Sequence, residues 1–462
     1  MLYEKLKPKQ KDAVRFALEK KTVALFFEQG TGKTWITGAL IEKLSNPGFT
    51  GLLVVPLSNI ETTWVELLKQ LEPTVCRSWR EFKKTSGSKI MLIHYDSFHK
   101  IVKQACKIHW SLVVFDESQK IKSRSSRQSR SAKKVHVGDC KLLLSGTPFD
   151  DFLNDPQELW AQFRFLVPSL FGTTWRTFDR NYLYPTGYKL KKRKFRKPML
   201  KIFLNKIEPY VMRVKKEEVF DLPLLSYQHV PVDLLGEQGR IYREFEQNMV
   251  VALENGTLTA GLRIVQINKL QQICGGFVID DDGTPRAVGR AKIRKLKSLL
   301  KRIELPVVVF CRYTEEIEQL VHELSTSNLR LATIQGRNRK ERSATVRRFQ
   351  EGKIDVLIAQ VRTGGIGVDL FRASNAVVYS TTFSFIDFDQ AVCRLHRGGQ
   401  TKPVKIFLLY AKNTIDKDVF DAILLKHKVS ELVLRRFKRK ETYHGKDKGE
   451  SSGEGDPEIR DQ

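Results

Sequence analysis

The sequence lacks the features of a membrane-spanning or secreted protein. No apolar run approaches the ~18–20 residues that cross a bilayer, and the first residues contain no apolar signal core. The six cysteines are widely spaced with no Cys-x-x-Cys pair, and the nine histidines show no metal-ligand spacing. These absences argue against a disulfide framework and a zinc site. They indicate a reducing compartment, which we expect to be the cytoplasm, or the nucleus if the host is eukaryotic.

Acidic residues are scarce relative to basic ones. The chain has 52 Asp and Glu against 80 Lys and Arg, which gives a formal charge of +28. Such an excess indicates an anionic partner, and without a membrane segment nucleic acid becomes the leading candidate. Hydrophobic residues make up 41% of the 462 residues, enough to build cores in two or three domains.

Short, continuous apolar runs recur in both the first and the last third of the chain, with helix-like stretches between them. Continuous runs are typical of strands that are buried on both faces of a parallel sheet. The pattern therefore predicts an α/β fold with two doubly wound parallel-sheet lobes. The predicted strands are 23–27, 52–55, 90–93, 112–115, 142–144, 307–310, 329–334, 356–359, 376–379 and 404–409, and the predicted helices are 34–44, 62–71, 315–324 and 340–349.

The middle of the chain, about residues 150 to 290, has aromatic and helical character instead. Helix-like stretches occur at 158–166, 175–182, 238–251 and 260–273. We expect helical protrusions between the two lobes, and a disordered tail over 441–462, where apolar residues are almost absent. The domains predicted are a first lobe over 1–205, with a protrusion from about 151, a bridge and second protrusion over 206–289, and a second lobe over 290–440.

The strongest local motif is Gly-Thr-Gly-Lys-Thr at 30–34, between a predicted strand and a predicted helix. Glycines let backbone N–H groups approach phosphates, Lys33 can reach the β- and γ-phosphates, and Thr34 can hold Mg²⁺. The first glycine of the general pattern is replaced by Phe27. A chance Gly-Lys-Thr is the alternative, but the strand–loop–helix context favours a phosphate site.

Three further motifs contain residues that could carry chemistry. Asp116-Glu117 lies at the end of a buried strand, where one carboxylate can hold Mg²⁺ and the other can deprotonate water. Ser-Gly-Thr-Pro at 145–148 follows another strand. If the segment 390–400 is helical, Arg394 and Arg397 share a face and could reach a γ-phosphate from the second lobe. Each motif alone also fits a turn or a solvated basic helix.

Together, in this order, the four segments resemble the helicase motifs of superfamily-two motors, and in particular the Swi/Snf branch of double-stranded DNA translocases. The resemblance covers about residues 2 to 425 and implies RecA-like lobes. It also points to compact members of prophages, phages and prokaryotes. The matching segments are Leu-Lys-Pro-Lys-Gln at 6–10, Glu-Gln-Gly-Thr-Gly-Lys-Thr at 28–34, Asp-Glu-Ser-Gln-Lys-Ile-Lys-Ser at 116–123, Leu-Ser-Gly-Thr-Pro at 144–148, Glu-Leu-Trp at 158–160, the bridge at 211–219 and Arg-Leu-His-Arg-Gly-Gly-Gln at 394–400.

The resemblance implies ATP and Mg²⁺ as cofactors and a role for each matching residue. The catalytic set is Lys33, Asp116, Glu117, Arg394 and Arg397, with Thr34 and Asp116 at the metal. The residues implied to bind ATP are Gln10, Glu28, Gln29, Gly30, Thr31, Gly32, Lys33, Thr34, Gly367, Asp369, Arg394 and Arg397. Those implied to line the DNA track are Pro56, Ser58, Asn59, Tyr95, Asp96, Ser97, Arg312, Gly336, Arg362, Thr363 and Gly364.

Two positions depart from the family pattern. Gln119 stands for the usual His, and Asp369 stands for Asn in a loop that lacks the usual Ser-Thr at its start. The first difference bears on how hydrolysis is coupled to movement, and the second on the individual DNA contacts.

Three basic runs, at 122–134, 189–197 and 435–440, fit either solvated surface or contacts to DNA phosphates. The run at 189–197 also contains a sequence that resembles a nuclear localisation signal. Phosphate contacts carry no sequence information, so we expect sequence-nonspecific binding of duplex DNA by a monomeric motor, with protein partners supplying any specificity.

The predicted function is DNA-stimulated ATP hydrolysis with translocation on double-stranded DNA. A strand-separating DNA or RNA helicase of the same superfamily is one alternative, and a non-catalytic nucleic-acid scaffold is another. The motor subunit of a restriction or remodelling assembly is a third.

Overall fold

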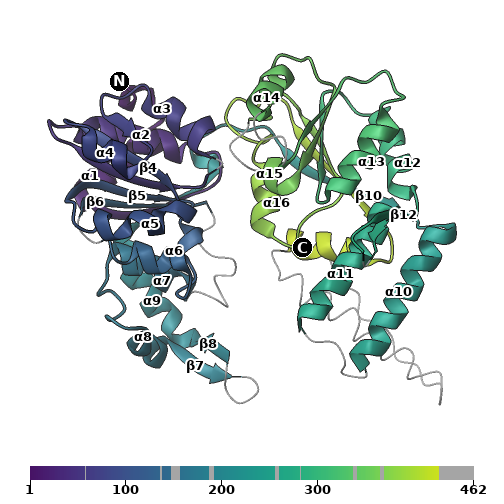
Figure 1. Ribbon diagram of the computed structural model, residues 1–462, viewed down its shortest axis with the longest axis horizontal. Helices are drawn as coiled ribbons and strands as arrows, with labels where there is room; N and C mark the ends of the chain where they lie inside the picture. The colour runs from purple at the N-terminus through teal and green to yellow at the C-terminus, as the bar shows by residue number, and fades with distance from the viewer. Residues whose placement is uncertain are drawn as a thin grey trace.

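The computed structural model describes residues 1–57, 59–135, 138–146, 157–186, 192–254, 260–280, 282–336, 341–364 and 369–425. These residues form two α/β lobes side by side, each built on one parallel sheet (Figure 1). The expected disordered tail and the basic run at 435–440 lie outside the described residues. Within the described part, no helix combines the length and apolar character needed to cross a membrane.

The first lobe contains a seven-stranded parallel sheet. Its spatial order is β3 (Thr74–Cys76), β4 (Lys89–His94), β2 (Thr50–Val55), β5 (Trp110–Asp116), β6 (Gly138–Leu144), β1 (Thr22–Phe27) and β9 (Val211–Val214). Successive residues alternate between two cores: Leu25 and Val114 pack on one face, and Ala24 and Phe115 on the other. Burial of both faces explains why the strands appear in the sequence as unbroken apolar runs.

Helices cover both faces of this sheet. α1 (Pro8–Lys20) and α2 (Lys33–Leu44) contribute to one core, and α5 (Tyr95–Ala105), α6 (Arg127–Ala132) and α7 (Glu158–Leu166) to the other. The helix expected over 62–71 is instead a π-helix, Ile60–Val65, followed by the short α3 (Glu66–Leu68). α4 (Trp79–Lys84) packs against β3 and β4.

The second lobe contains a six-stranded parallel sheet with the order β10 (Leu225–Val232), β17 (Val404–Ala411), β16 (Asn375–Val378), β13 (Val307–Cys311), β15 (Val356–Gln360) and β14 (Leu331–Ile334). α12 (Ala291–Leu300) and α13 (Thr314–Leu324) cover one face. α14 (Arg342–Gln350), α15 (Val361–Gly364), α16 (Phe385–Val392) and α17 (Ile415–Leu424) complete the described helices of the lobe. The predicted strands of both lobes are thus present, and the α/β class is confirmed.

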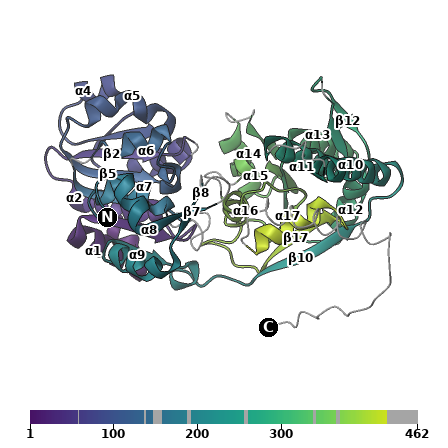
Figure 2. The same ribbon diagram turned by 90° about the horizontal axis from the view of Figure 1, so that it is seen from below.

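The bridge between the lobes supplies one edge strand to each sheet. β9 pairs with β1 of the first lobe, and β10 pairs along its whole length with β17 of the second. Figure 2 shows the chain crossing from the first lobe to β10 of the second. The sequence did not predict either strand, because β9 is only four residues long and β10 is largely exposed.

Both lobes carry the expected protrusions (Figure 1). The first comprises α7, α8 (Trp175–Tyr182), α9 (Leu200–Ile207) and an antiparallel hairpin of β7 (Leu183–Thr186) and β8 (Lys192–Phe195). Its core is aromatic, and the rings of Phe171 and Phe203 stack with centroids 4.5 Å apart. The second consists of α10 (Gly236–Glu254) and α11 (Ala260–Gly275), which lead into the hairpin of β11 (Phe277–Ile279) and β12 (Pro285–Ala287).

A buried ion pair joins two helices of the second lobe and yields a stability prediction. Lys292 of α12 lies 2.8 Å from Asp416 of α17, and their side chains are 1% and 0% exposed. Lys292→Met leaves the Asp416 carboxylate without its counter-ion, so we expect the free energy of unfolding to fall by about 3–5 kcal/mol. Chemical denaturation followed by circular dichroism measures this change.

Lys297→Met is the matched control on the same helix. Its partner Glu323 is at 2.7 Å, but Lys297 is 36% exposed, so the cost should stay below about 1 kcal/mol. Equal costs for the two variants would contradict a special contribution from the buried pair.

Candidate functional site

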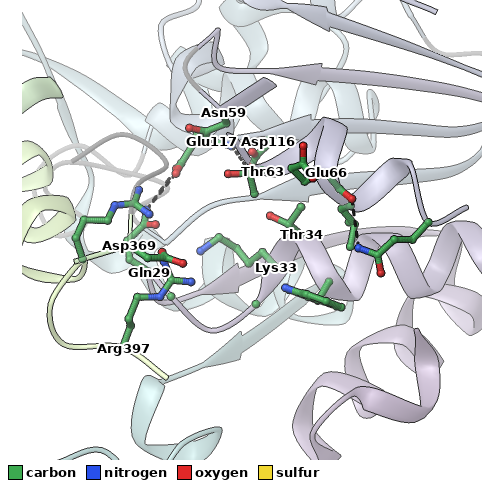
Figure 3. A pocket seen from close by; sticks show the side chains of 16 residues that line it. Gln29, Lys33, Thr34, Asn59, Thr63, Glu66, Asp116, Glu117, Asp369 and Arg397 are labelled. Carbon is green, nitrogen blue, oxygen red and sulfur yellow. Dashed lines mark hydrogen bonds and ion pairs between the residues drawn. The ribbon is translucent and has the colours of Figure 1, made fainter. Parts of the chain in front are cut away.

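A hollow of about 260 Å³ lies where the two lobes meet. Residues of both lobes line it, and Figure 3 shows Lys33, Asp116 and Glu117 of the first lobe opposite Asp369 and Arg397 of the second. The lining residues are Gln29, Gly30, Gly32, Lys33, Thr34, Trp35, Asn59, Thr63, Glu66, Leu67, Gln70, Asp116, Glu117, Asp369, Arg394 and Arg397. All five residues of the predicted catalytic set are among them.

The loop between β1 and α2 forms the floor of the hollow. Gly30 and Gly32 have φ of +81° and +84°, a left-handed conformation that glycine adopts at little cost. A Cβ on Gly32 would also lie 2.4 Å from Gln10 Nε2, so a side chain there would displace the Gln10 amide. The N-terminus of α2 follows at Lys33, so its unpaired N–H groups are available to phosphate oxygens.

Lys33 is buried and bound to its own loop. Its Nζ donates to the carbonyl oxygens of Phe27, at 2.8 Å, and Glu28, at 3.1 Å. Burial lowers the pKa of Lys33, while Glu117 and Asp116 act in the opposite direction. The Lys33 ammonium therefore lies near the carboxylates of Asp116 and Glu117. It is hydrogen-bonded to two backbone carbonyls, which an anionic ligand could replace.

Asp116 ends β5 and is held from two sides. Its Oδ1 accepts the N–H of Glu117 at 2.9 Å, and its Oδ2 accepts the indole N–H of Trp64 at 3.0 Å. Burial and the neighbouring charge of Glu117 raise the pKa of Asp116 to about 6, and the hydrogen bond from Trp64 opposes this rise. Near neutral pH the carboxylate is thus ionised, desolvated and fixed in direction, as a metal ligand should be.

Glu117 has a left-handed backbone, with φ +51° and ψ 57°, which directs its side chain into the hollow. Its Oε2 accepts a hydrogen bond from Gln119 Nε2 at 2.8 Å, and Gln29 Nε2 lies 3.3 Å from Oε1. Gln119 Oε1 in turn accepts from Ser145 Oγ at 2.7 Å. Gln119 therefore connects the Glu117 carboxylate to Ser145, which follows β6. Of the Ser-Gly-Thr-Pro motif at 145–148, Thr147 and Pro148 lie outside the described residues.

The second lobe contributes Arg394 and Arg397. The helix that the sequence suggested for this segment ends earlier, because α16 stops at Val392 and both arginines lie in the turns that follow. Arg397 forms an ion pair with Asp369, and a Cβ on Gly30 would lie 3.3 Å from Arg397 Cβ. The arginine-bearing turns therefore touch the phosphate loop of the first lobe.

The other residues with an expected role in ATP binding either do not line the hollow or lie outside the described residues. Gln10 donates to Thr31 O at 2.8 Å and so supports the loop from α1, and Thr31 Oγ1 donates to Glu28 O at 2.7 Å. Glu28 accepts the N–H of Lys216 at 3.1 Å. Gln10, Thr31 and Glu28 are not among the residues that line the hollow. Gly367 lies outside the described residues.

The residues expected on the DNA track are spread over both lobes. Asn59 lines the hollow, and the buried Tyr95 hydroxyl donates to Asp116 O at 2.7 Å. Asp96 is exposed, and Ser97 Oγ is 2.8 Å from His94 Nε2.

In the second lobe, Arg312 bonds Asn268 and Gln271 of α11 and lies over the Phe383 ring, while Arg362 pairs with Asp387 at 3.1 Å. Pro56 directly follows β2, Gly336 lies shortly after β14, and Thr363 and Gly364 end α15. Ser58 lies outside the described residues.

Sequence reasoning missed Trp64. Its side chain is fully buried in the π-helix, and its N–H reaches Asp116 from 52 residues away. A buried indole needs a hydrogen-bond acceptor, but the sequence gives no means of identifying which one. In the described part of the chain, no cluster of three or more His, Cys, Asp or Glu could hold a metal ion alone. A cation in the hollow would take its remaining ligands from a bound molecule or water.

The Trp64 bond yields the second prediction. Trp64→Phe removes the donor to a charged oxygen, and we expect the metal-free protein to lose about 1.5–3 kcal/mol of unfolding free energy at pH 8. Because Asp116 becomes protonated below its pKa of about 6, the cost should shrink at pH 5. Trp110→Phe is the control: Trp110 is equally buried but donates to a neutral carbonyl, Ala105 O, at 2.9 Å. A pH-dependent cost in both variants, or in neither, would contradict the assignment.

Two protein-family models match most of the chain. The family model described as the SNF2-related domain matches residues 9–275, and that of the helicase conserved C-terminal domain matches residues 291–399. The chain is 26% identical over 460 residues to the SWI/SNF chromatin-remodeling complex subunit snf22 of Schizosaccharomyces pombe, covering 90% of this chain and 27% of that protein. It is also 26% identical over 435 residues to an uncharacterized ATP-dependent helicase of Mycoplasma genitalium, covering 90% of this chain and 41% of that protein.

A solved structure of the Sulfolobus solfataricus SWI2/SNF2 ATPase core in complex with double-stranded DNA is similar with a TM-score of 0.43 and 22% identity, covering 91% of this chain and 90% of that one. The chain spans less than half the length of the two curated relatives described above. The SNF2-related model alone covers more than half of the chain. The protein therefore belongs to the SNF2-related family of Swi/Snf-type superfamily-two ATPases.

Proposed function

We propose that the chain hydrolyses ATP in the hollow between its lobes and uses the cycle to translocate along double-stranded DNA. The observation that carries the proposal is the meeting of Lys33, Asp116 and Glu117 with Arg394 and Arg397 around one cavity. Phosphoryl transfer needs positioned charge on all sides of the γ-phosphate, and each lobe supplies only part of it. Opening and closing of the lobes therefore couples to hydrolysis.

The first-lobe residues bind the triphosphate and activate water. The N–H groups of the Gly30–Gly32 loop and of the start of α2 bind phosphate oxygens. Lys33 Nζ leaves the carbonyls of Phe27 and Glu28 for the β- and γ-phosphates. Glu117, held by Gln29 and Gln119, accepts a proton from the attacking water. The water oxygen bonds to the γ-phosphorus while the bond between the γ-phosphorus and the ADP oxygen breaks.

The residues present fit Mg²⁺. The Asp116 carboxylate and the Thr34 hydroxyl both line the hollow, and Mg²⁺ prefers one or two such oxygens together with phosphate oxygens and water. When bound, Mg²⁺ neutralises negative charge on the phosphates. Trp64 keeps the Asp116 carboxylate oriented for this ligand.

The arginines of the second lobe act on the transition state. Arg394 and Arg397 reach the γ-phosphoryl group from the second lobe and stabilise the charge that spreads over its oxygens. Asp369 holds Arg397 until the nucleotide arrives.

Duplex DNA as the track is supported by the charge of +28 and by the names of relatives that are ATP-dependent helicases or remodelling subunits. We propose the domain boundaries at 205, 289 and 440, a monomeric motor that works where DNA and a reducing environment coexist, and protein partners as the source of specificity. A strand-separating helicase remains the second candidate, because a relative is named as a helicase. Duplex unwinding measured beside triplex displacement separates the two.

Glu117→Gln tests the proposed base. The substitution removes the proton acceptor but keeps the shape, so DNA-stimulated ATP hydrolysis should fall by about 10²–10⁴-fold while duplex binding stays unchanged. Steady-state phosphate release and fluorescence anisotropy measure the two. Glu61→Gln, at an exposed carboxylate paired with Arg77, is the control and should retain wild-type turnover. Wild-type turnover in Glu117→Gln would show that another group takes the proton.

Salt titration tests the DNA track. Because phosphate contacts release counter-ions, affinity for a duplex of any sequence should fall by about 10–10³-fold between 50 and 200 mM salt. Duplexes of unrelated sequence but equal length should bind within about threefold of one another, since backbone contacts do not read bases. Salt-independent binding would contradict a phosphate track.

A further inference from the structure

A buried lysine of the bridge reaches across the junction of the lobes next to the arginine-bearing turns. Lys216 lies two residues after β9, and its Nζ donates to Cys393 Sγ. Lys216 is 9% exposed and Cys393 is 3% exposed. Cys393 is followed directly by Arg394. The contact therefore connects the first lobe to the residue next to a proposed catalytic arginine.

The backbone of Lys216 is fixed to the phosphate loop. Its N–H donates to Glu28 Oε2 at 3.1 Å, and the N–H of Glu28 donates to Val214 O at 3.1 Å. β9 also pairs with β1 in register, with Val214 opposite Phe27. Lys216 thus moves with the start of the loop that carries Gly30 and Lys33.

Cys393 is equally well fixed within the second lobe. Its N–H donates to Asp389 O at 2.9 Å, so it continues the last turn of α16. On its other side, Arg394 O accepts the N–H of Leu370 at 3.0 Å. A displacement of Cys393 therefore displaces Arg394, because neighbouring Cα atoms are only ~3.8 Å apart.

The chemistry of the pair suits a directional contact. Burial raises the pKa of the Cys393 thiol to about 12, so the sulfur is neutral at pH 7 and accepts through a lone pair. Burial lowers the pKa of Lys216, but the hydrogen bond to Cys393 and the carboxylates of Asp389 and Glu28 outweigh this, and the net direction is upward. A buried ammonium without a partner is costly, so Lys216 favours the arrangement in which Cys393, and with it Arg394, lies at the phosphate loop.

We propose that Lys216 is a positioning residue for ATP hydrolysis, which places Arg394 against the phosphate loop by holding Cys393. The inference rests on the proposed function, since Arg394 acts on ATP only if ATP is hydrolysed here. It assigns the bridge, and β9 in particular, the task of setting the distance between loop and arginine. The bridge thereby contributes directly to the chemistry as well as to the linkage of the lobes.

Turnover of substituted full-length protein tests the proposal. Lys216→Met and Cys393→Ala should each lower kcat by about tenfold with KM for ATP within about twofold of wild type, because ground-state binding is unchanged. The double variant should be no slower than the slower single variant, since both remove the same contact. Cys393→Ser keeps an acceptor of similar size and should stay within about threefold of wild type. Additive losses would overturn the proposal.

Lys215→Met is the matched control, because Lys215 is the exposed neighbour in the same loop. It should leave kcat unchanged. Equal losses in Lys215→Met and Lys216→Met, or equal losses in Cys393→Ser and Cys393→Ala, would indicate general damage to the bridge or to the turn and would overturn the proposal.

Amide hydrogen exchange separates this inference from the proposed function, because it needs no turnover. Peptides that contain residues 393–400 should exchange at least about threefold faster in Lys216→Met than in wild type or Lys215→Met. Unchanged exchange would overturn the inference even if ATP hydrolysis is found. A wild-type protein without DNA-stimulated hydrolysis would overturn the proposed function, and faster exchange would then still establish the contact.

Discussion

The rest of the structure depends on one constraint: the phosphate loop and the arginine-bearing turns belong to different lobes and must meet. Gly30 and Arg397 already lie in close contact, and Lys216 joins Cys393 across the same junction. Charges that phosphoryl transfer requires are therefore complete only when both lobes come together. A site of this kind is controlled by any process that changes lobe spacing, which is how DNA binding could set the rate of hydrolysis.

Parallel sheets make such a site possible. The carboxyl ends of β1 and β5 face the same edge, so the loop after Phe27 and the pair Asp116-Glu117 converge without further structure. Hydrogen bonds from neighbouring residues fix both carboxylates. Trp64 donates to the Asp116 side chain, Tyr95 donates to the Asp116 backbone, and Gln119 joins Glu117 to Ser145. These bonds hold desolvated charges in place before a ligand arrives, so little reorganisation remains for the reaction itself.

Local sequence signals predicted most of the fold because burial on both faces leaves an unbroken apolar run for each central strand. They also pointed to Lys33, Asp116, Glu117, Arg394 and Arg397, five of the charged residues that line the hollow, because the motifs that contain them are contiguous. Local signals failed wherever a residue's interaction partner is distant in the sequence. Nothing near Val211–Val214 shows that it pairs with β1, and nothing near Trp64 or Lys216 points to Asp116 or Cys393. The early end of α16 at Val392 was missed for the same reason, since Leu370 bonds the turn that replaces the next helical residues.

The central claim is that the second lobe completes the chemistry of the first. Single-turnover hydrolysis by Arg394→Ala, with nucleotide affinity measured in parallel, tests it most directly. An arginine that acts on the transition state is worth about 10³–10⁵ in rate, so hydrolysis on saturating duplex DNA should fall by about that factor while the Kd for ATP changes less than about threefold. Hydrolysis at the wild-type rate in this variant would show that the first lobe works alone and would contradict the account.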